Sequence, residues 1–187
     1  MDLFISEFLM PLLLYTTIGV ILLFFLEVFR RTRQVSGLTP VLVVDDTGQI
    51  LADFQNYLNK YQPDCYDITT AADVEQARQI LDGFQPQYAI VDLRLDKPSL
   101  LHSENDDKKG IDSELKGLQL IKFILENKLP TRIIVLSGFT HDDVKDKIAS
   151  TFADFPNKDK ILQDIQQNYV FKGEGNYILA VLDKLKK

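Results

Sequence analysis

Residues 87–95, QYAIVDLRL, contain a short apolar run at 88–91 that is followed by one carboxylate, Asp92. A second run, VLVV at 41–44, ends in two carboxylates, Asp45 and Asp46. Both runs are rich in valine, isoleucine or leucine and are bounded by polar residues, which is typical of buried parallel strands. Open parallel sheets bind ligands in a crevice at the carboxyl ends of their strands. We therefore expect the three carboxylates to lie in one site.

Three carboxylates in one site repel one another, so they cannot all stay ionised without a cation beside them. Ligand sets made only of oxygen suit a hard cation such as Mg²⁺. The pattern therefore predicts Mg²⁺ as the cofactor, held by Asp45, Asp46 and Asp92.

The composition is that of a globular protein of one domain with an appendage. The chain has 187 residues, of which 45% are hydrophobic and 26% are charged. Its first 33 residues hold three acidic and three basic side chains, so the net charge of −6 belongs to residues 34–187. That charge argues against nucleic acid as a direct partner. The single cysteine, Cys65, excludes an internal disulfide, and we expect it to pack in the core.

Residues 8–26 are uncharged and predict a single membrane-spanning helix. At helical rise the 19 residues extend about 28 Å, close to the thickness of a bilayer core. The basic flank at 30–33, RRTR, predicts an outer N-terminus and a cytoplasmic C-terminal part in the cytoplasmic (inner) membrane. A cleaved signal peptide would need a basic start and a small-residue cleavage site, and a buried core helix is rarely apolar on every face. The expected domains are an anchor at 1–33, a linker at 34–40 and a globular domain at 41–187.

Strand and helix patterns alternate after residue 40. Apolar runs predict strands at 41–45, 65–70, 88–92, 132–136 and 168–171. Amphipathic patterns predict helices around 50–58, 72–81, 115–126 and 177–185, with one or two more inside 141–167. This alternation predicts a parallel α/β sheet built from βαβ units. Residues 93–114 do not fit the alternation of strands and helices, and we interpret them as an insertion that is either functional or merely solvated.

Two further polar residues stand at predicted strand ends, Ser137 and Lys172. Asp92, at the tip of a central strand, can bind the metal and can also attack a phosphoryl group, because carboxylates form acyl phosphates. The metal and the Lys172 ammonium would neutralise charge on that group, and the Ser137 hydroxyl could donate to one of its oxygens.

This set of residues closely resembles the receiver (CheY-like) domain of two-component response regulators. The matching segments, in chain order, are VLVVDD at 41–46, IVDLRL at 90–95, IIVLSG at 133–138 and YVFK at 169–172. The resemblance implies a flavodoxin-like (βα)5 fold with strand order 2-1-3-4-5. It also implies Asp92 as the phosphoacceptor, the Arg94 backbone carbonyl as a further metal ligand, Ser137 and Tyr169 as switch residues, and Lys172 as the phosphate-binding lysine.

The sequence departs from the family in three places. Gly173 follows the lysine where the family usually has a cis proline, and the 93–114 insertion lies beside Asp92. The segment between Ser137 and Lys172 is also longer than in the family. Separately from these departures, we expect no output domain after the last helix.

The expected function is that of a membrane-tethered receiver rather than a conventional enzyme. It would accept a phosphoryl group on Asp92 from a histidine kinase or phosphotransfer protein and signal through a separate protein. The alternative is a pseudo-receiver that acts as a constitutive docking module at the membrane. A phosphatase of the haloacid dehalogenase type would need an aspartate two residues after its nucleophile, where this chain has Thr47 or Arg94. The kinase, downstream partner, stimulus and oligomeric state are not specified by the sequence.

Overall fold

The computed structural model describes residues 37–62, 64–95, 115–173 and 175–186. Residues Thr39–Lys187 belong to one compact unit. Strands and helices alternate along most of its described part. In chain order they are β1 (Thr39–Val44), α3 (Gly48–Tyr61), β2 (Tyr66–Ala71), α4 (Val74–Gly83), β3 (Tyr88–Asp92), α5 (Lys116–Glu126), β4 (Arg132–Ser137), α6 (His141–Thr151), α7 (Lys158–Gln167), β5 (Tyr169–Phe171) and α8 (Tyr177–Leu185).

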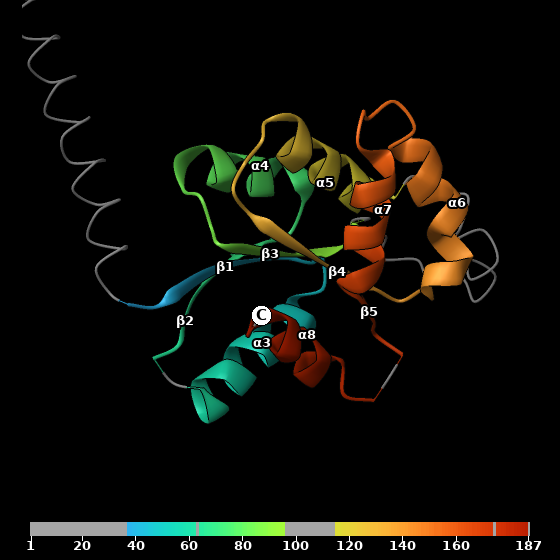
Figure 1. The fold of residues 1–187 in the computed structure, drawn as a ribbon. Coiled ribbons are helices and arrows are strands. Elements are labelled where there is room, and N and C mark those ends of the chain that lie inside the picture. Colours follow the sequence, from blue (N-terminus) through green and yellow to red (C-terminus); the bar gives the residue numbers. More distant parts are fainter. Residues whose placement is uncertain (1–36, 63, 96–114, 174, 187) are drawn as a thin grey trace, which may run out of the picture. The chain divides into compact units, whose positions relative to one another are not determined.

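The five strands form one sheet in the order β2-β1-β3-β4-β5, and every neighbouring pair is parallel. This order confirms the predicted flavodoxin-like topology. Helices α3 and α8 cover one face of the sheet, and α4, α5 and α7 cover the other (Figure 1). The apolar strands follow from this layering, because a sheet covered on both faces buries side chains on both.

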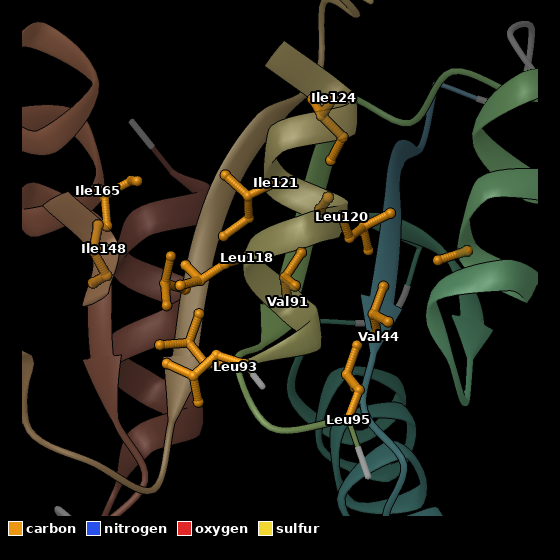
Figure 2. Packing of buried hydrophobic residues seen from close by; sticks show 14 of the residues in the cluster. Val44, Val91, Leu93, Leu95, Leu118, Leu120, Ile121, Ile124, Ile148 and Ile165 are labelled. Atoms are coloured by element: carbon orange, nitrogen blue, oxygen red, sulfur yellow. The ribbon is translucent and has the colours of Figure 1, made fainter. Parts of the chain in front are cut away.

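Each face of the sheet has its own hydrophobic core. Val41, Val43 and Ile90 pack with α3 and α8, whereas their neighbours Leu42, Val44 and Val91 pack on the opposite face. Figure 2 shows the second core, in which Leu118, Leu120 and Ile121 of α5 gather with Val44 and Val91. Strand alternation thus divides each apolar run between the two layers.

Most predicted elements are present, with shifts at their ends. Strand β3 has the predicted bounds, and the 141–167 segment forms two helices, α6 and α7. Strand β1 begins two residues before the predicted start, because Thr39 and Pro40 pair with Tyr66 and Asp67 of β2. It ends at Val44, since the Asp45 side chain turns to accept a hydrogen bond from the Thr47 backbone N–H at 2.8 Å.

The prediction that Cys65 packs in the core is wrong, because its side chain is exposed. Cys65 lies just before β2, where its backbone carbonyl accepts the Thr39 N–H at 2.8 Å. The backbone therefore joins the sheet while the thiol stays outside the apolar layers.

Two predicted features lie outside the described residues: the membrane-spanning helix at 8–26 and most of the insertion, at 96–114. Within the described ranges, no helix is long and apolar enough to cross a membrane.

Candidate functional site

The carboxyl ends of four neighbouring strands bring the predicted polar residues to one edge of the sheet. Asp45 and Asp46 follow β1, and Asp92 ends β3. Ser137 ends β4, and Lys172 follows β5. The three acidic side chains each offer a carboxylate oxygen within 4.8 Å of the others. The predicted acidic cluster therefore exists in the fold.

Lys172 lies at the centre of this cluster. Its Nζ donates to Oδ2 of Asp45 and to Oδ2 of Asp92, both at 2.7 Å. The Asp45 side chain is fully buried and that of Asp92 is 7% exposed, so these are desolvated ion pairs. The Lys172 backbone N–H donates to the Ser137 carbonyl at 2.7 Å. This bond fixes the Lys172 backbone, from which the side chain extends, against the end of β4. A buried ion pair is favourable only when its geometry is good, and removing one partner leaves an uncompensated charge away from water.

The environment shifts the pKa values of Asp46, Asp92 and Lys172. Burial raises the pKa of Asp92 to about 6, although the Lys172 ammonium opposes the rise. Burial and the neighbouring Asp45 charge raise the pKa of Asp46. Burial alone would lower the pKa of Lys172, but the Asp92 and Asp45 carboxylates outweigh it and raise that pKa overall. The raised pKa values of Asp46 and Asp92 show that the site disfavours ionised carboxylates, which an added cation would favour.

The oxygens of Asp45 and Asp92 that do not contact Lys172 are held by the backbone. Oδ1 of Asp45 accepts the Thr47 N–H at 2.8 Å, and Oδ1 of Asp92 accepts the Arg94 N–H at 3.2 Å. Both carboxylates are therefore oriented before any ligand arrives, which lowers the cost of ordering them on binding.

The donor set fits Mg²⁺. It consists of three carboxylates that converge on one point, two of them buried, at the rim of a sheet. Asp45, Asp46 and Asp92 would hold the ion, which would supply charge neutralisation at an oxygen anion. The predicted contribution of the Arg94 carbonyl stays a prediction, since the observed contact of that residue with Asp92 is through its N–H.

A glycine that the sequence analysis missed allows α5 to lie close to the end of β3 at Asp92. Gly117 lies in the first turn of α5, and its N–H donates to the Leu93 carbonyl at 3.0 Å. A Cβ at this position would lie 2.0 Å from the Asp92 backbone oxygen and 2.7 Å from the Leu93 Cα. Only glycine permits this approach of helix to strand. A glycine three residues after the insertion, at the start of an amphipathic helix pattern, was the available signal.

Ser137 and Tyr169, the predicted switch residues, are connected through the backbone of Phe139. The fully buried Ser137 Oγ accepts the Phe139 N–H at 3.1 Å, and the Tyr169 hydroxyl donates to the Phe139 carbonyl at 2.8 Å. Burial raises the pKa of Tyr169 to about 12, so its hydroxyl keeps its proton. The His141 ring meets the Tyr169 ring edge-on at 5.4 Å. A movement of Ser137 would thus disturb both Phe139 and Tyr169.

The family departure at Gly173 has a local counterpart in packing. The ring of Phe171 lies where a Gly173 Cβ would be, with the ring Cζ at 2.4 Å. The described residues contain no cis peptide bond. The Lys172 ammonium nevertheless reaches both carboxylates.

Comparison with known proteins finds likeness in structure alone. No family model matches the chain, and no curated protein sequence matches it. Among solved structures, a receiver domain protein from Methanospirillum hungatei aligns with a TM-score of 0.52 at 16% identity, covering 80% of this chain and 91% of that one. A chemotaxis response regulator of Vibrio cholerae aligns with a TM-score of 0.53 at 18% identity, covering 79% and 98%. The fold is that of a response-regulator receiver domain.

A third similar structure was solved with ligands bound. The response regulator TrrA from Thermotoga maritima, solved in complex with Mg²⁺ and BeF, aligns with a TM-score of 0.50 at 20% identity and covers 80% of this chain and 97% of that one. At these identities the likeness is one of fold.

Proposed function

We propose that this receiver fold accepts a phosphoryl group on Asp92 in the presence of Mg²⁺, from a histidine kinase or phosphotransfer protein. The observation that carries the proposal is the Lys172 ammonium, 2.7 Å from Oδ2 of both Asp45 and Asp92 in a cluster of three carboxylates. A nucleophilic carboxylate, a cation beside it and a hard-metal donor set are the parts that phosphoryl transfer requires.

The chemistry of the step assigns a task to each residue. An oxygen of ionised Asp92 attacks phosphorus, the P–N bond of a phosphohistidine donor breaks, and the leaving imidazole keeps the electron pair and takes up a proton. Lys172 follows the transferred group by exchanging its bond to Asp92 for one to a phosphoryl oxygen. Asp45, Asp46 and Asp92 would hold the metal, with the Arg94 carbonyl as a proposed further ligand, and Mg²⁺ would supply charge neutralisation there. Attack needs the ionised carboxylate, which the Lys172 ammonium and a bound Mg²⁺ would both favour.

We expect Asp92→Asn to abolish phosphorylation by acetyl phosphate. The amide keeps the shape of the side chain but lacks a nucleophilic oxygen anion. The measurement is the intact mass of the full chain after incubation with acetyl phosphate and Mg²⁺, with EDTA in a parallel sample. An equal gain of one phosphoryl group in Asp92→Asn would place the acceptor elsewhere. No gain in the unmutated chain would favour the pseudo-receiver, a constitutive docking module.

Signalling through a separate protein is proposed to use the Ser137–Phe139–Tyr169 connection. A phosphoryl group on Asp92 offers strong acceptor oxygens, toward which Ser137 Oγ would turn as a donor. That turn releases the Phe139 N–H that Oγ now accepts, and it alters the carbonyl that Tyr169 holds. The surface around α6 would then change, as in switches that couple local charge to a bistable packing element.

Beryllofluoride, which stands in for the phosphoryl group on Asp92, provides the test of this switch. We expect NMR shifts at residues 92–95, 137–145 and 169–173 when it is added with Mg²⁺. In Ser137→Ala the shifts beyond the metal pocket should largely disappear, because the alanine has no hydroxyl to turn. Shifts confined to the pocket in the unmutated chain would contradict the switch.

Membrane tethering through residues 8–26 is a further part of the proposal. Its support is the uncharged run of 19 residues and the basic RRTR flank. The full chain should stay with the membrane fraction at high salt, because burial of apolar side chains is not screened by ions. Protease added outside intact cells should leave residues 34–187 uncut, and their cleavage would reverse the proposed cytoplasmic orientation.

A further inference from the structure

Asp46 is the least constrained of the three carboxylates. Asp45 and Asp92 are buried and each has hydrogen bonds to both oxygens, whereas Asp46 is half-buried. Its Oδ1 accepts the Thr47 hydroxyl at 3.3 Å, and its carboxylate also interacts with the Asp46 backbone N–H. Repulsion from Asp45 and the pull of water both favour turning this side chain away from the cluster. Attraction to the Lys172 ammonium opposes this rotation, and the Thr47 hydroxyl opposes it through a hydrogen bond.

Thr47 occupies a position where a threonine side chain ordinarily caps the helix. It is the N-cap residue of α3, yet its side chain makes no capping hydrogen bond. A threonine at an N-cap ordinarily accepts a backbone N–H of the first turn, and replacing it by alanine typically costs about 1 kcal/mol. Here the hydroxyl donates to the preceding Asp46.

The chain contains a second N-cap threonine for comparison. Thr140 precedes α6 and donates its hydroxyl to Oδ2 of Asp143 at 2.6 Å, and its backbone N–H donates to the same oxygen at 2.9 Å. Asp143 lies three residues along in the first turn, so Thr140 stabilises the start of its own helix. The two threonines occupy equivalent positions, but only Thr47 contacts the acidic cluster.

We infer that Thr47 is a positioning residue of the Mg²⁺ site, whose hydroxyl holds Asp46 in the orientation that binds the metal. The inference rests on the proposed function, since it concerns the same metal. The Thr47 backbone N–H holds Asp45 and its hydroxyl holds Asp46, so one residue orients both members of the acidic pair. Outer contacts of this kind fix metal ligands, and their loss typically weakens metal affinity about 10- to 100-fold.

The test uses Thr47→Val in the full chain, purified in detergent. Valine keeps the branched shape and the backbone N–H to Asp45 but removes the hydroxyl. We expect the Mg²⁺ dissociation constant, measured by isothermal titration calorimetry, to rise about tenfold, the lower end of the range because the contact is exposed. The melting temperature without Mg²⁺ should stay close to that of the unmutated chain, because this hydroxyl does not cap α3.

Two control variants separate an effect of the Thr47 hydroxyl on the metal site from an effect on helix stability. Thr47→Ser retains the hydroxyl and should keep the unmutated affinity. Thr140→Val should lower the melting temperature without Mg²⁺ and leave the Mg²⁺ affinity unchanged. Unchanged affinity in Thr47→Val, or an equal loss in Thr47→Ser, would overturn the role of the hydroxyl. Absence of Mg²⁺ binding by the unmutated chain would instead overturn the proposed function itself.

Discussion

Replacing Gly117 by alanine is expected to destabilise the domain by at least about 3 kcal/mol, because the new methyl group would meet backbone rather than a movable side chain. Its Cβ would lie 2.0 Å from the Asp92 oxygen, 2.7 Å from the Leu93 Cα and 2.9 Å from the Asp92 carbonyl carbon. Relief requires α5 to move away from β3, which would open the core around Leu118 and Ile121. Domains of this size are stable by only about 5–15 kcal/mol, so this loss would remove a large share of the free energy of unfolding.

A matched control for this prediction is Gly83→Ala. Gly83 is exposed at the end of α4, and a Cβ there meets no atom within 4 Å. Alanine should be tolerated or slightly stabilising at that position. Urea unfolding followed by circular dichroism measures the free energy of unfolding of both variants. Equal stability of Gly117→Ala and the unmutated protein would show that α5 does not approach β3 so closely.

Replacing Lys172 by methionine is expected to lower the free energy of unfolding by about 3–5 kcal/mol at neutral pH without Mg²⁺. The substitution keeps most of the side-chain volume but leaves the buried carboxylates of Asp45 and Asp92 without their shared cation. Mg²⁺ should restore part of the stability, since a second cation at the three carboxylates replaces the lost charge.

The pH dependence of stability tests the same electrostatics, in Mg²⁺-free solution. The folded-state pKa of Asp92, about 6, lies above the ordinary value of 3.8, so between these values the folded protein binds more protons than the unfolded one. Stability therefore falls as pH rises through this window, by about 3 kcal/mol in total for this group. In Lys172→Met the pKa of Asp92 should rise further, so the fall should be larger and continue to higher pH. Saturating Mg²⁺ favours the ionised carboxylate and should flatten the profile.

The control for Lys172→Met is Lys122→Met on α5. Lys122 forms an exposed pair with Glu126 at 3.8 Å, with side chains 41% and 53% exposed, and its loss should change stability by less than about 1 kcal/mol. Urea unfolding at pH 5 and pH 7.5 compares the two variants. If Lys172→Met were no less stable than Lys122→Met at pH 7.5, the buried ion pairs would not exist in solution.

The strand ends show how far sequence reasoning reached. Apolar runs that stop at Asp45, Asp92 and Ser137 predicted both the parallel sheet and the edge where these residues meet. The argument worked because parallel strands point their carboxyl ends the same way, so a residue's place in the run also gives its place in the fold. The same reasoning gave the Lys172 position, although β5 has only three residues.

The sequence by itself determined the order of strands and helices, the two-sided burial of the apolar runs and the group of residues at the site. Those properties depend on local periodicity, which is visible along the chain. Only the tertiary structure decided that Lys172 bridges Asp45 and Asp92, from which it is separated by 127 and 80 positions. It also decided that Gly117 must lack a Cβ, that Thr47 contacts Asp46 and that Cys65 is exposed. These features depend on how close separate elements pack and how side chains turn at their ends, and no periodic pattern records either.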